Sequence, residues 1–318
     1  MVQIVLIGIA AGIAAALLFA SIVSGALISL VLFYLAPLPI LIVSLGWSHW
    51  AGLIGAVVAA GGLAAVFSGN LFLAFLIGIG LPSWWIGYLA LLARPVATPA
   101  GTVLEWYPAG RITLWVAGLS SLVVVSVLFT LGMTEESVHG ELRRGFEVLL
   151  RRSGSPAGPV EDASRIDTLV SMAPPAAAIS ITLVNLAMVW LAGRIVKTSK
   201  RLRRPWPDIA QMTFPPTAAA LLAAAMIGTL LAGLTSIISG VVAASLATAY
   251  AVLGFAVLHS ISRGVSARSL LLAIAYVAVV LIWPVLVLIA LLGLTDSLFD
   301  IRGRIARKRG PPPPALRN

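Results

Sequence analysis

The chain has 318 residues, of which 60% are hydrophobic and only 10% are charged. Soluble globular domains carry about 25% charged residues, so the composition excludes a soluble globular protein. A net charge of +10 would suggest a nucleic-acid partner in a soluble chain, but in this one it indicates orientation in a membrane, because the charges lie in loops.

The charged residues are segregated along the chain. Residues 1–93 contain no Asp, Glu, Lys or Arg, and all 32 formal charges fall in five windows. A charge at the centre of a membrane helix costs about 2.5–3.5 kcal/mol on the insertion scale, so the windows mark loops between membrane spans. The windows are 94–111, 133–170, 194–212, 261–268 and 296–318.

The apolar runs between these windows are long enough to cross a bilayer, which takes about 20 residues per helix. A backbone in lipid must satisfy its own hydrogen bonds, so the predicted fold class is all-α: one polytopic bundle of about 8–9 membrane helices over residues 1–295. No basic segment precedes the first run, so a cleaved signal peptide is not expected. The expected helices are 3–23, 25–46, 48–68, 71–93, 112–132, 171–193, 213–231, 236–260 and 269–293.

The weakest boundary of this prediction lies in residues 1–47. This segment alternatively forms one long tilted helix and one short helix, broken at Pro37 and Pro39. Either arrangement crosses the membrane twice, so the alternative does not change the orientation of the rest of the chain.

Two basic clusters predict which side of the membrane the loops face. One lies at 194–204 and includes Arg201, Arg203 and Arg204; the other lies in the tail 296–318, which is Pro-rich and expected to be disordered. Basic loops favour the cytoplasmic side, so both clusters are placed in the cytoplasm.

Three predicted helices separate the two clusters, and three crossings would put them on opposite sides. We therefore expect one re-entrant helix, in the segment 213–238, and eight full crossings. The net-negative window 133–170 then lies outside. The residues that favour an irregular 213–238 are Pro215, Pro216, Gly228 and Gly233.

Window 133–170 is expected to contain a short amphipathic helix. Val138, Leu142, Phe146 and Leu149 recur at helical spacing, with charged residues on the other faces. The pattern predicts a helix that lies in the membrane interface. The alternative is a solvated loop helix that binds nothing.

The first helix carries small residues four apart, Gly8, Gly12, Ala16 and Ala20. This spacing lets helix backbones approach closely. The stripe either packs inside the bundle or serves as a docking face for another membrane subunit.

Catalytic and metal-binding patterns are missing from the sequence. His49, His139 and His259 are far apart, no HExxH, GxSxG or phosphate-loop motif occurs, and there is no cysteine. No carboxylate lies at mid-depth of a span, which argues against a proton-driven pump. We therefore expect neither an enzyme nor a cofactor nor a metal site.

Aromatic and polar residues near the span ends are the better candidates for function. They are either an interfacial aromatic belt or the lining of a cavity for a small ligand with an apolar ring and a few polar groups. Glu105 either accepts hydrogen bonds from that ligand or pairs with Arg111. The candidate pocket residues are Trp47, His49, Asn70, Trp84, Trp85, Tyr88, Glu105, Trp106, Asn185 and His259.

Three segments resemble the YybS-like family of predicted bacterial membrane proteins. They are Leu35-Ala-Pro37-Leu-Pro39-Ile before Gly46-Trp47, Gly80-Leu-Pro82 before Trp85-Ile-Gly87-Tyr88, and Gly254-Phe-Ala-Val-Leu-His259 with the closing Leu292-Gly-Leu-Thr-Asp296-Ser-Leu-Phe-Asp300-Ile-Arg302. That family is distantly similar to the S components of energy-coupling-factor (ECF) vitamin transporters and to the rod-shape protein MreD. The resemblance implies an S-component-like core, with the small-residue face of the first helix meeting a transmembrane partner.

Two functions follow from these features. The first is a small-molecule-binding transporter subunit, with a metabolite ligand and a transmembrane coupling subunit carrying ATPases as partners besides the lipid bilayer. It predicts a sealed pocket that opens outward. The alternative is a non-enzymatic scaffold of cell-envelope assembly. Asp296, Asp300 and Arg302 either mark the water boundary after the last helix or contact a partner.

Overall fold

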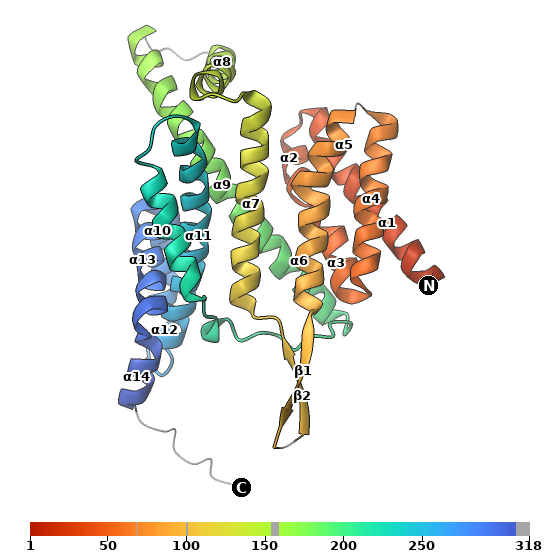
Figure 1. The fold of residues 1–318 in the computed structure, drawn as a ribbon, viewed down its shortest axis with the longest axis vertical. Coiled ribbons are helices and arrows are strands. Elements are labelled where there is room, and N and C mark those ends of the chain that lie inside the picture. The colour runs from red at the N-terminus through yellow and green to blue at the C-terminus, as the bar shows by residue number, and fades with distance from the viewer. Residues whose placement is uncertain (68, 100, 154–158, 310–318) are drawn as a thin grey trace.

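The computed structural model describes residues 1–67, 69–99, 101–153 and 159–309 and shows a helical bundle with one β-hairpin (Figure 1). Among these described residues, seven helical segments are long and apolar enough to cross a membrane, and Pro216–Gly228, Arg268–Val279 and Pro284–Phe299 are shorter apolar helices. The predicted all-α membrane bundle is confirmed. The hairpin, between residues 93 and 106, was not expected.

The N-terminal half consists of the helices that precede the hairpin. They are α1 (Val2–Ala20), η1 (Ser21–Ser24), α2 (Leu27–Tyr34), α3 (Pro37–Gly46), α4 (His49–Val66), α5 (Gly69–Phe75), the π-helical η2 (Leu76–Gly80) and α6 (Leu81–Leu91).

The hairpin and the C-terminal half follow. They are β1 (Ala93–Thr98), β2 (Gly101–Trp106), α7 (Ala109–Leu131), α8 (Glu135–Ser153), α9 (Pro159–Thr198), η3 (Ile209–Gln211), α10 (Pro216–Gly228), α11 (Leu234–Ile261), α12 (Arg268–Leu281), α13 (Trp283–Phe299) and α14 (Ile301–Arg309).

Small residues bring α1 and α4 together as parallel neighbours. A Cβ atom on Gly8 would lie 2.8 Å from the carbonyl oxygen of Ala51, and one on Gly12 would lie 2.6 Å from that of Gly55. Ala16 and Ala20 pack on the core cluster beneath them. Of the two alternatives for Gly8, Gly12, Ala16 and Ala20, the structure shows packing inside the bundle, with α4 against the two glycines.

Prolines interrupt the N-terminal half in two places. The predicted span 25–46 is two helices, α2 and α3, with the break directly before Pro37. The predicted span 71–93 contains the π-turn η2, which ends two residues before Pro82. Proline lacks an N–H and clashes with the carbonyl four residues earlier, and a π-turn relieves such a clash by widening the helix.

The long helix α9 joins the two halves. Its 40 residues extend about 60 Å, twice the thickness of the hydrocarbon core. It contacts α3 in the N-terminal half and α7 and α11 in the C-terminal half, and it crosses behind both in Figure 1. The predicted span 171–193 is only the middle of this helix.

The predicted helix 269–293 is wrong, because the chain reverses inside it. The backbone leaves the helical region at Ile282 (φ −129°, ψ 88°), just before Trp283 and Pro284. Pro284 has no N–H with which to continue α12. The segment therefore forms two short antiparallel helices, α12 and α13, which enter the bundle from one end and return to it.

The tightest packing in the C-terminal half is between α11 and α13. A Cβ atom on Gly293 would lie 2.7 Å from the backbone nitrogen of Gly254, so side chains at these positions would collide with the opposite backbone. The two glycines hold the returning helix α13 against α11, at the centre of this half.

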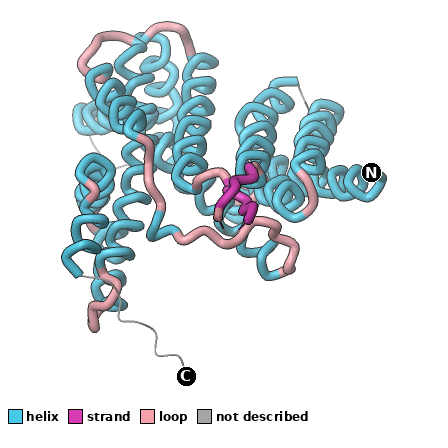
Figure 2. Tube along the Cα trace, turned by 60° about the horizontal axis from the view of Figure 1, so that its bottom comes forward, coloured by secondary structure: helices cyan, strands magenta, loops and turns pink. Residues whose placement is uncertain are grey.

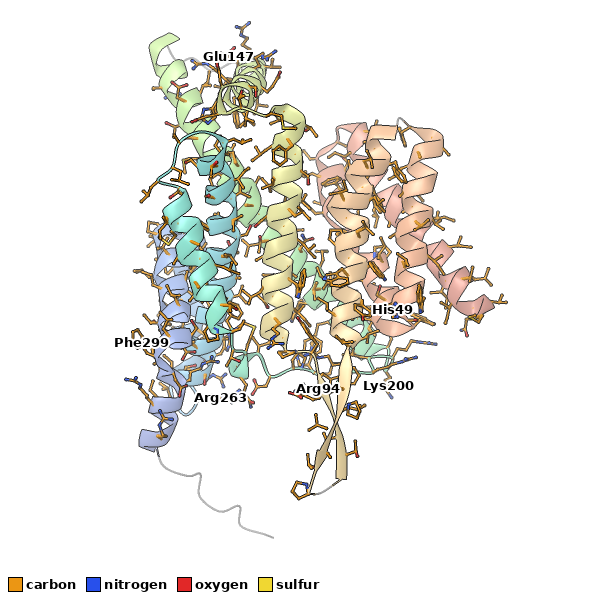
Figure 3. All side chains as sticks on the ribbon, viewed as in Figure 1. His49, Arg94, Glu147, Lys200, Arg263 and Phe299 are labelled. Atoms are coloured by element: carbon orange, nitrogen blue, oxygen red, sulfur yellow. The ribbon has the colours of Figure 1, made fainter. Side chains whose placement is uncertain are left out.

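Charge divides the bundle into two ends. The basic end, defined by residues 94–111, 194–212, 261–268 and 296–309, carries 15 basic and 4 acidic residues. The opposite end, defined by residues 133–170, carries 5 basic and 7 acidic residues. Figure 3 shows Arg94, Lys200 and Arg263 at the basic end and Glu147 at the other.

The cluster at 194–204 and the described part of the basic tail, 296–309, therefore lie at the same end of the bundle, as expected. Disorder was expected in this tail, but Ile301–Arg309 forms the helix α14, and 310–318 lie outside the described residues. The expected place of the irregularity is wrong, however. Segment 213–238 forms the antiparallel helices α10 and α11 around a turn at 229–233, and the additional reversal lies at Ile282. Together these turns return the chain to the basic end.

The amphipathic helix predicted in 133–170 is present as α8, which lies across the opposite end (Figure 1). Val138 is fully buried among Val124, Leu128, Ala178 and Val241, which belong to α7, α9 and α11. The N-terminal part of α8 thus packs on the bundle, whereas Leu149 near its other end is exposed.

Candidate ligand-binding sites

The structure does not gather the predicted pocket residues in one place. They fall in an aromatic cluster near the basic end, in a recess at the base of the hairpin, in a cavity between the two halves, and in a pocket between α11 and α12. The side chain of Asn70 lies outside the described residues.

The aromatic cluster is defined as Trp47, His49, Trp84, Trp85 and Tyr88. Ring contacts connect the last four of these predicted residues, and Trp47 lies two residues before His49 in the chain. His49 meets Tyr88 edge to face with ring centroids 5.2 Å apart, and Tyr88 lies 5.5 Å from Trp85. Trp84 stacks on Tyr88 at 6.3 Å. His49 lies toward the basic end, as a residue of an interfacial belt would (Figure 3).

Four members of the aromatic cluster carry buried nitrogen atoms without a hydrogen-bond partner in the described part of the chain. These are the Nε1 atoms of Trp47, Trp84 and Trp85 and Nδ1 of His49. Buried polar groups in proteins are nearly always paired. The hydrogen-bonding capacity of this cluster is thus unused within the protein, although the rings themselves pack closely.

Glu105 pairs with Arg94 and not with Arg111, which corrects one of the two predicted roles. The hairpin places Arg94 directly opposite Glu105 in the register of β1 and β2, and Nη2 lies 2.7 Å from Oε2. Both side chains are more than half exposed. Glu105 and Trp106 line an open recess of about 400 Å³ with Arg111, at the base of the hairpin.

The predicted basic cluster is divided among different contacts. The Arg201 guanidinium lies 4.5 Å from the centroid of the Trp47 ring. Nη1 of Arg204 donates to the carbonyl of Ala90 at 3.4 Å, and burial lowers the pKa of this guanidinium. Arg203 is exposed. Two of the three arginines therefore attach the 199–215 loop to the N-terminal half.

Asn185 lines the lateral cavity, which we define as the space of about 270 Å³ between the N-terminal and C-terminal halves. Its Nδ2 atom donates to Oγ of Ser120 at 3.2 Å. The rest of the lining is almost entirely apolar. The other lining residues are Phe19, Phe33, Tyr34, Pro37, Ala74, Gly78, Ile79, Val123, Val127, Ile181 and Val184.

His259 lines the basic-end pocket, which we define as the space of about 640 Å³ between loop 206–210, α11 and α12. Its Nε2 atom is hydrogen-bonded to the Tyr276 hydroxyl at 3.0 Å. Arg263 forms an ion pair with Asp208, with Nη2 at 3.0 and 2.9 Å from the two carboxylate oxygens. This contact lowers the pKa of Asp208.

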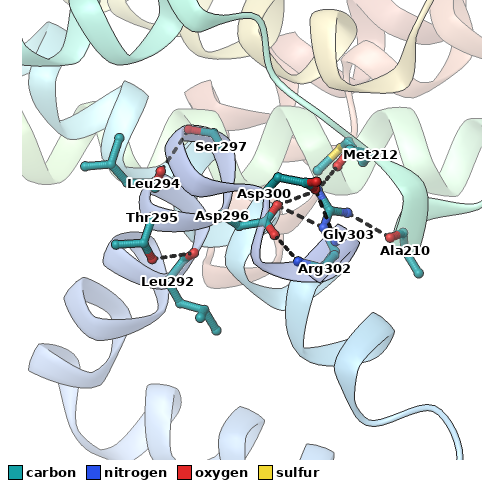
Figure 4. Close-up of polar contacts among 10 residues, drawn as sticks. All are labelled: Ala210, Met212, Leu292, Leu294, Thr295, Asp296, Ser297, Asp300, Arg302 and Gly303. Carbon is teal, nitrogen blue, oxygen red and sulfur yellow. Dashed lines mark hydrogen bonds and ion pairs between the residues drawn. The ribbon is translucent and has the colours of Figure 1, made fainter. Parts of the chain in front are cut away.

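The closing segment does not simply mark a water boundary. The Asp296 carboxylate is buried and pairs with the Arg302 guanidinium at 2.7 Å. Arg302 also donates to the backbone carbonyls of Ala210 and Met212, both at 2.8 Å (Figure 4). The contact of Asp296 is internal, since through Arg302 it connects α13 to the loop before α10.

The described residues contain no group of three or more His, Asp or Glu side chains that could hold a metal ion. The ionisable side chains lie at the two ends of the bundle, and the spaces within it are lined by apolar, amide and hydroxyl groups. Such linings suit binding by shape and a few hydrogen bonds.

One comparison with known proteins decides the family. The family model described as "Predicted membrane protein (DUF2232)" matches residues 12–297, which is nearly the whole chain. The chain belongs to the DUF2232 family. No curated protein and no solved structure matches it. Membership of DUF2232 agrees with the membrane-spanning bundle and implies no particular activity.

Sequence reasoning found only one residue of each of two sites in this DUF2232 protein, Asn185 in the lateral cavity and His259 in the basic-end pocket. The lateral cavity is lined mainly by ordinary apolar residues from seven elements, and only Asn185 stood out in the sequence. The basic-end pocket includes Asp208 and Arg263, which are 55 residues apart. The only sequence signal for their pairing was that both belong to windows at the same end.

Proposed function

We propose that this chain is the non-enzymatic, small-molecule-binding subunit of a transporter in the bacterial inner membrane, in the manner of an ECF S component. The observation that carries the proposal is the lateral cavity, a partly open space between the two halves with few polar groups in its lining. The membrane-spanning fold and the family support an integral membrane protein, and the ligand and transport role are the proposal.

The lining of the lateral cavity defines the class of ligand. Phe19 and Phe33 form one wall with ring centroids 5.2 Å apart. Because Nδ2 of Asn185 already donates to Ser120, its Oδ1 atom is left to accept a hydrogen bond. The volume of about 270 Å³ lies near the lower limit for ligand pockets. The ligand that fits is a small molecule with an apolar ring and one donor group.

The position of the lateral cavity supports uptake from outside. Val127 lies four residues before the end of α7 at the opposite end of the bundle, and Phe19 lies near the corresponding end of α1. If the basic end is cytoplasmic, the cavity lies in the outer half of the membrane. The C-terminal helices α13 and α14 then end in the cytoplasm.

The π-turn η2 forms part of the cavity wall, and it supports the proposal that the lateral cavity changes shape. Gly78 and Ile79, which line the cavity, both belong to this turn. Such turns are wider than an α-helix, are less stable and occur frequently at functional sites. A shift of η2 toward regular α-helix would move these two residues relative to α7.

The chain has no phosphate-loop motif with which to use ATP. Energy for transport would therefore come from a partner, and we propose a transmembrane coupling subunit with ATPases. Its contact surface is not the stripe of Gly8 and Gly12, because α4 covers that stripe.

A scaffold of cell-envelope assembly, in the manner of MreD, is the second candidate. The observation that favours it is the hairpin, which projects from the basic end (Figure 1 and Figure 2). Val103 and Leu104 of β2 are each 56% exposed, although they are apolar. Exposed apolar strands pair readily with other chains.

Native mass spectrometry of the protein, extracted gently from its own membrane, separates the two functions. A transporter subunit should carry a small-molecule adduct and arrive with a membrane partner and ATPases. Arrival with cell-envelope proteins and without an adduct, or arrival alone without an adduct, would overturn the transporter proposal.

A further inference from the structure

The basic-end pocket combines a charged mouth with an apolar interior. Its mouth is formed by Asp208, Arg263 and Arg268, and its interior by Val252, Phe255 and Ala256 of α11. Because α11 is a membrane-spanning helix, the interior lies at a depth where lipid chains begin. A ligand of this pocket must therefore be polar at one end and apolar at the other.

The charges at the mouth favour an anion. The Asp208 carboxylate is neutralised by its two-oxygen contact with Arg263. Arg268 is exposed, and its guanidinium has no hydrogen-bond or ion-pair partner among the described residues. His259 also lines the pocket, and its Nε2 atom is hydrogen-bonded to the Tyr276 hydroxyl. One arginine is thus left to bind a negatively charged group.

The start of α12 adds to this preference. Arg268 is the first residue of α12, whose first turn contains no acidic side chain and no side-chain cap. Aspartate or glutamate usually compensates the positive end of the helix dipole. In α12 the Arg268 cation occupies the first position instead. An anion from outside the protein would therefore be stabilised by both the Arg268 guanidinium and the positive end of the helix dipole.

The helix α12, which contributes Arg268 and Tyr276 to the pocket, also carries exposed apolar side chains. Tyr276 of α12 stacks on Phe255 of α11 with ring centroids 4.5 Å apart and an interplanar angle of 5°. Along the same helix, Leu270, Ile274 and Val277 are each more than half exposed. Such apolar residues belong against lipid, so a lipid molecule can reach the pocket without leaving the membrane.

We propose that the basic-end pocket binds the phosphate-containing headgroup of an anionic phospholipid. Arg268, with Arg263 beside it, contacts the phosphate, and the first part of the lipid chains lies against Phe255 and Tyr276. The site is independent of the lateral cavity and of the transport role.

The test is native mass spectrometry of the full-length protein released from vesicles of phosphatidylcholine containing one-fifth phosphatidylglycerol. Wild-type protein should retain phosphatidylglycerol in preference to phosphatidylcholine. Arg268→Gln should lower that retention about fivefold, the change expected for one basic residue near a membrane surface. Arg203→Gln is the matched control, because it removes the same charge from the same end but outside the pocket, and it should leave retention unchanged.

Three results would overturn this proposal. The first is equal retention of the two lipids by the wild type, and the second is equal loss in the two variants. The third is displacement of phosphatidylglycerol by millimolar inorganic phosphate, which would show that the pocket recognises free phosphate and not a lipid. Phe255→Ala provides an independent arm: it should weaken retention of the lipid, because it removes the apolar wall without changing any charge.

Discussion

Asp296 and Arg302 form an ion pair that is almost completely removed from solvent, with side chains 3% and 12% exposed. The backbone N–H of Arg302 donates to the same carboxylate at 3.0 Å. The remaining guanidinium donors reach two carbonyls in the loop before α10 (Figure 4). This contact joins α13 and α14 to that loop and holds the last helical hairpin at the basic end.

Asp296→Asn should destabilise the protein strongly. Removing one partner of a buried ion pair leaves the other charge uncompensated, which costs about 3–5 kcal/mol. Thermal unfolding of the detergent-solubilised protein would measure the effect. Asp300→Asn is the control, since Asp300 is 67% exposed and asparagine tolerates its left-handed backbone. Similar unfolding temperatures for the two variants would contradict the structural role given to Asp296.

Gly12→Ala should also destabilise the bundle, although it adds only a methyl group. That methyl would lie 2.6 Å from the carbonyl oxygen of Gly55, so α1 would have to move away from α4. Overpacking of this kind costs about 1–3 kcal/mol. Gly61→Ala on α4 meets no atom within 4 Å and should be neutral or slightly stabilising. Equal unfolding temperatures for both variants would show that α1 and α4 do not pack in this way.

The Asp208–Arg263 contact should depend on pH in a defined direction. Because the contact lowers the pKa of Asp208 below its usual 3.8, folding favours the ionised carboxylate. The stabilisation is complete above pH 3.8 and is lost as the pH falls through the lowered pKa. Unfolding curves of wild type and Asp208→Asn should differ at neutral pH and converge below that pKa. A constant difference at all pH values would contradict the assignment.

The arrangement of the two ends can be tested with single cysteines, because the chain has none of its own. A membrane-impermeant thiol reagent should label Arg203→Cys and Arg307→Cys from one side of the membrane and Glu147→Cys from the other. Labelling of positions 203 and 307 from opposite sides would show that α12 and α13 do not form a returning hairpin.

Hydrophobicity and charge were enough to predict the class of fold and the ends of most spans. Apolar runs predict helices in lipid because no other backbone arrangement satisfies its hydrogen bonds there. The reversal at Ile282 was missed because the run around it is apolar throughout. Pro284 was its only signal, and membrane helices often tolerate proline.

The candidate sites could be predicted only in part, because they depend on which helices become neighbours. His49, Trp84, Trp85 and Tyr88 were found because aromatic residues near span ends are conspicuous. The burial of Asp296 could not be found, since it requires Ala210 and Met212 from a distant loop. The pairing of Glu105 was missed because residues 93–106 were not recognised as a hairpin.

The most direct test of ligand binding in the lateral cavity is to fill it. A Cβ atom on Gly78 would have Val123 4.0 Å away as its nearest neighbour, so Gly78→Leu places its side chain in the cavity. Gly61→Leu is the matched control, because its side chain enters open space on α4. The measurement is the mass of small molecules that stay bound in native mass spectrometry. We predict an adduct of non-lipid mass on the wild type and on Gly61→Leu and none on Gly78→Leu. A non-lipid adduct that survives Gly78→Leu, or a wild type without any non-lipid adduct, would contradict the proposal.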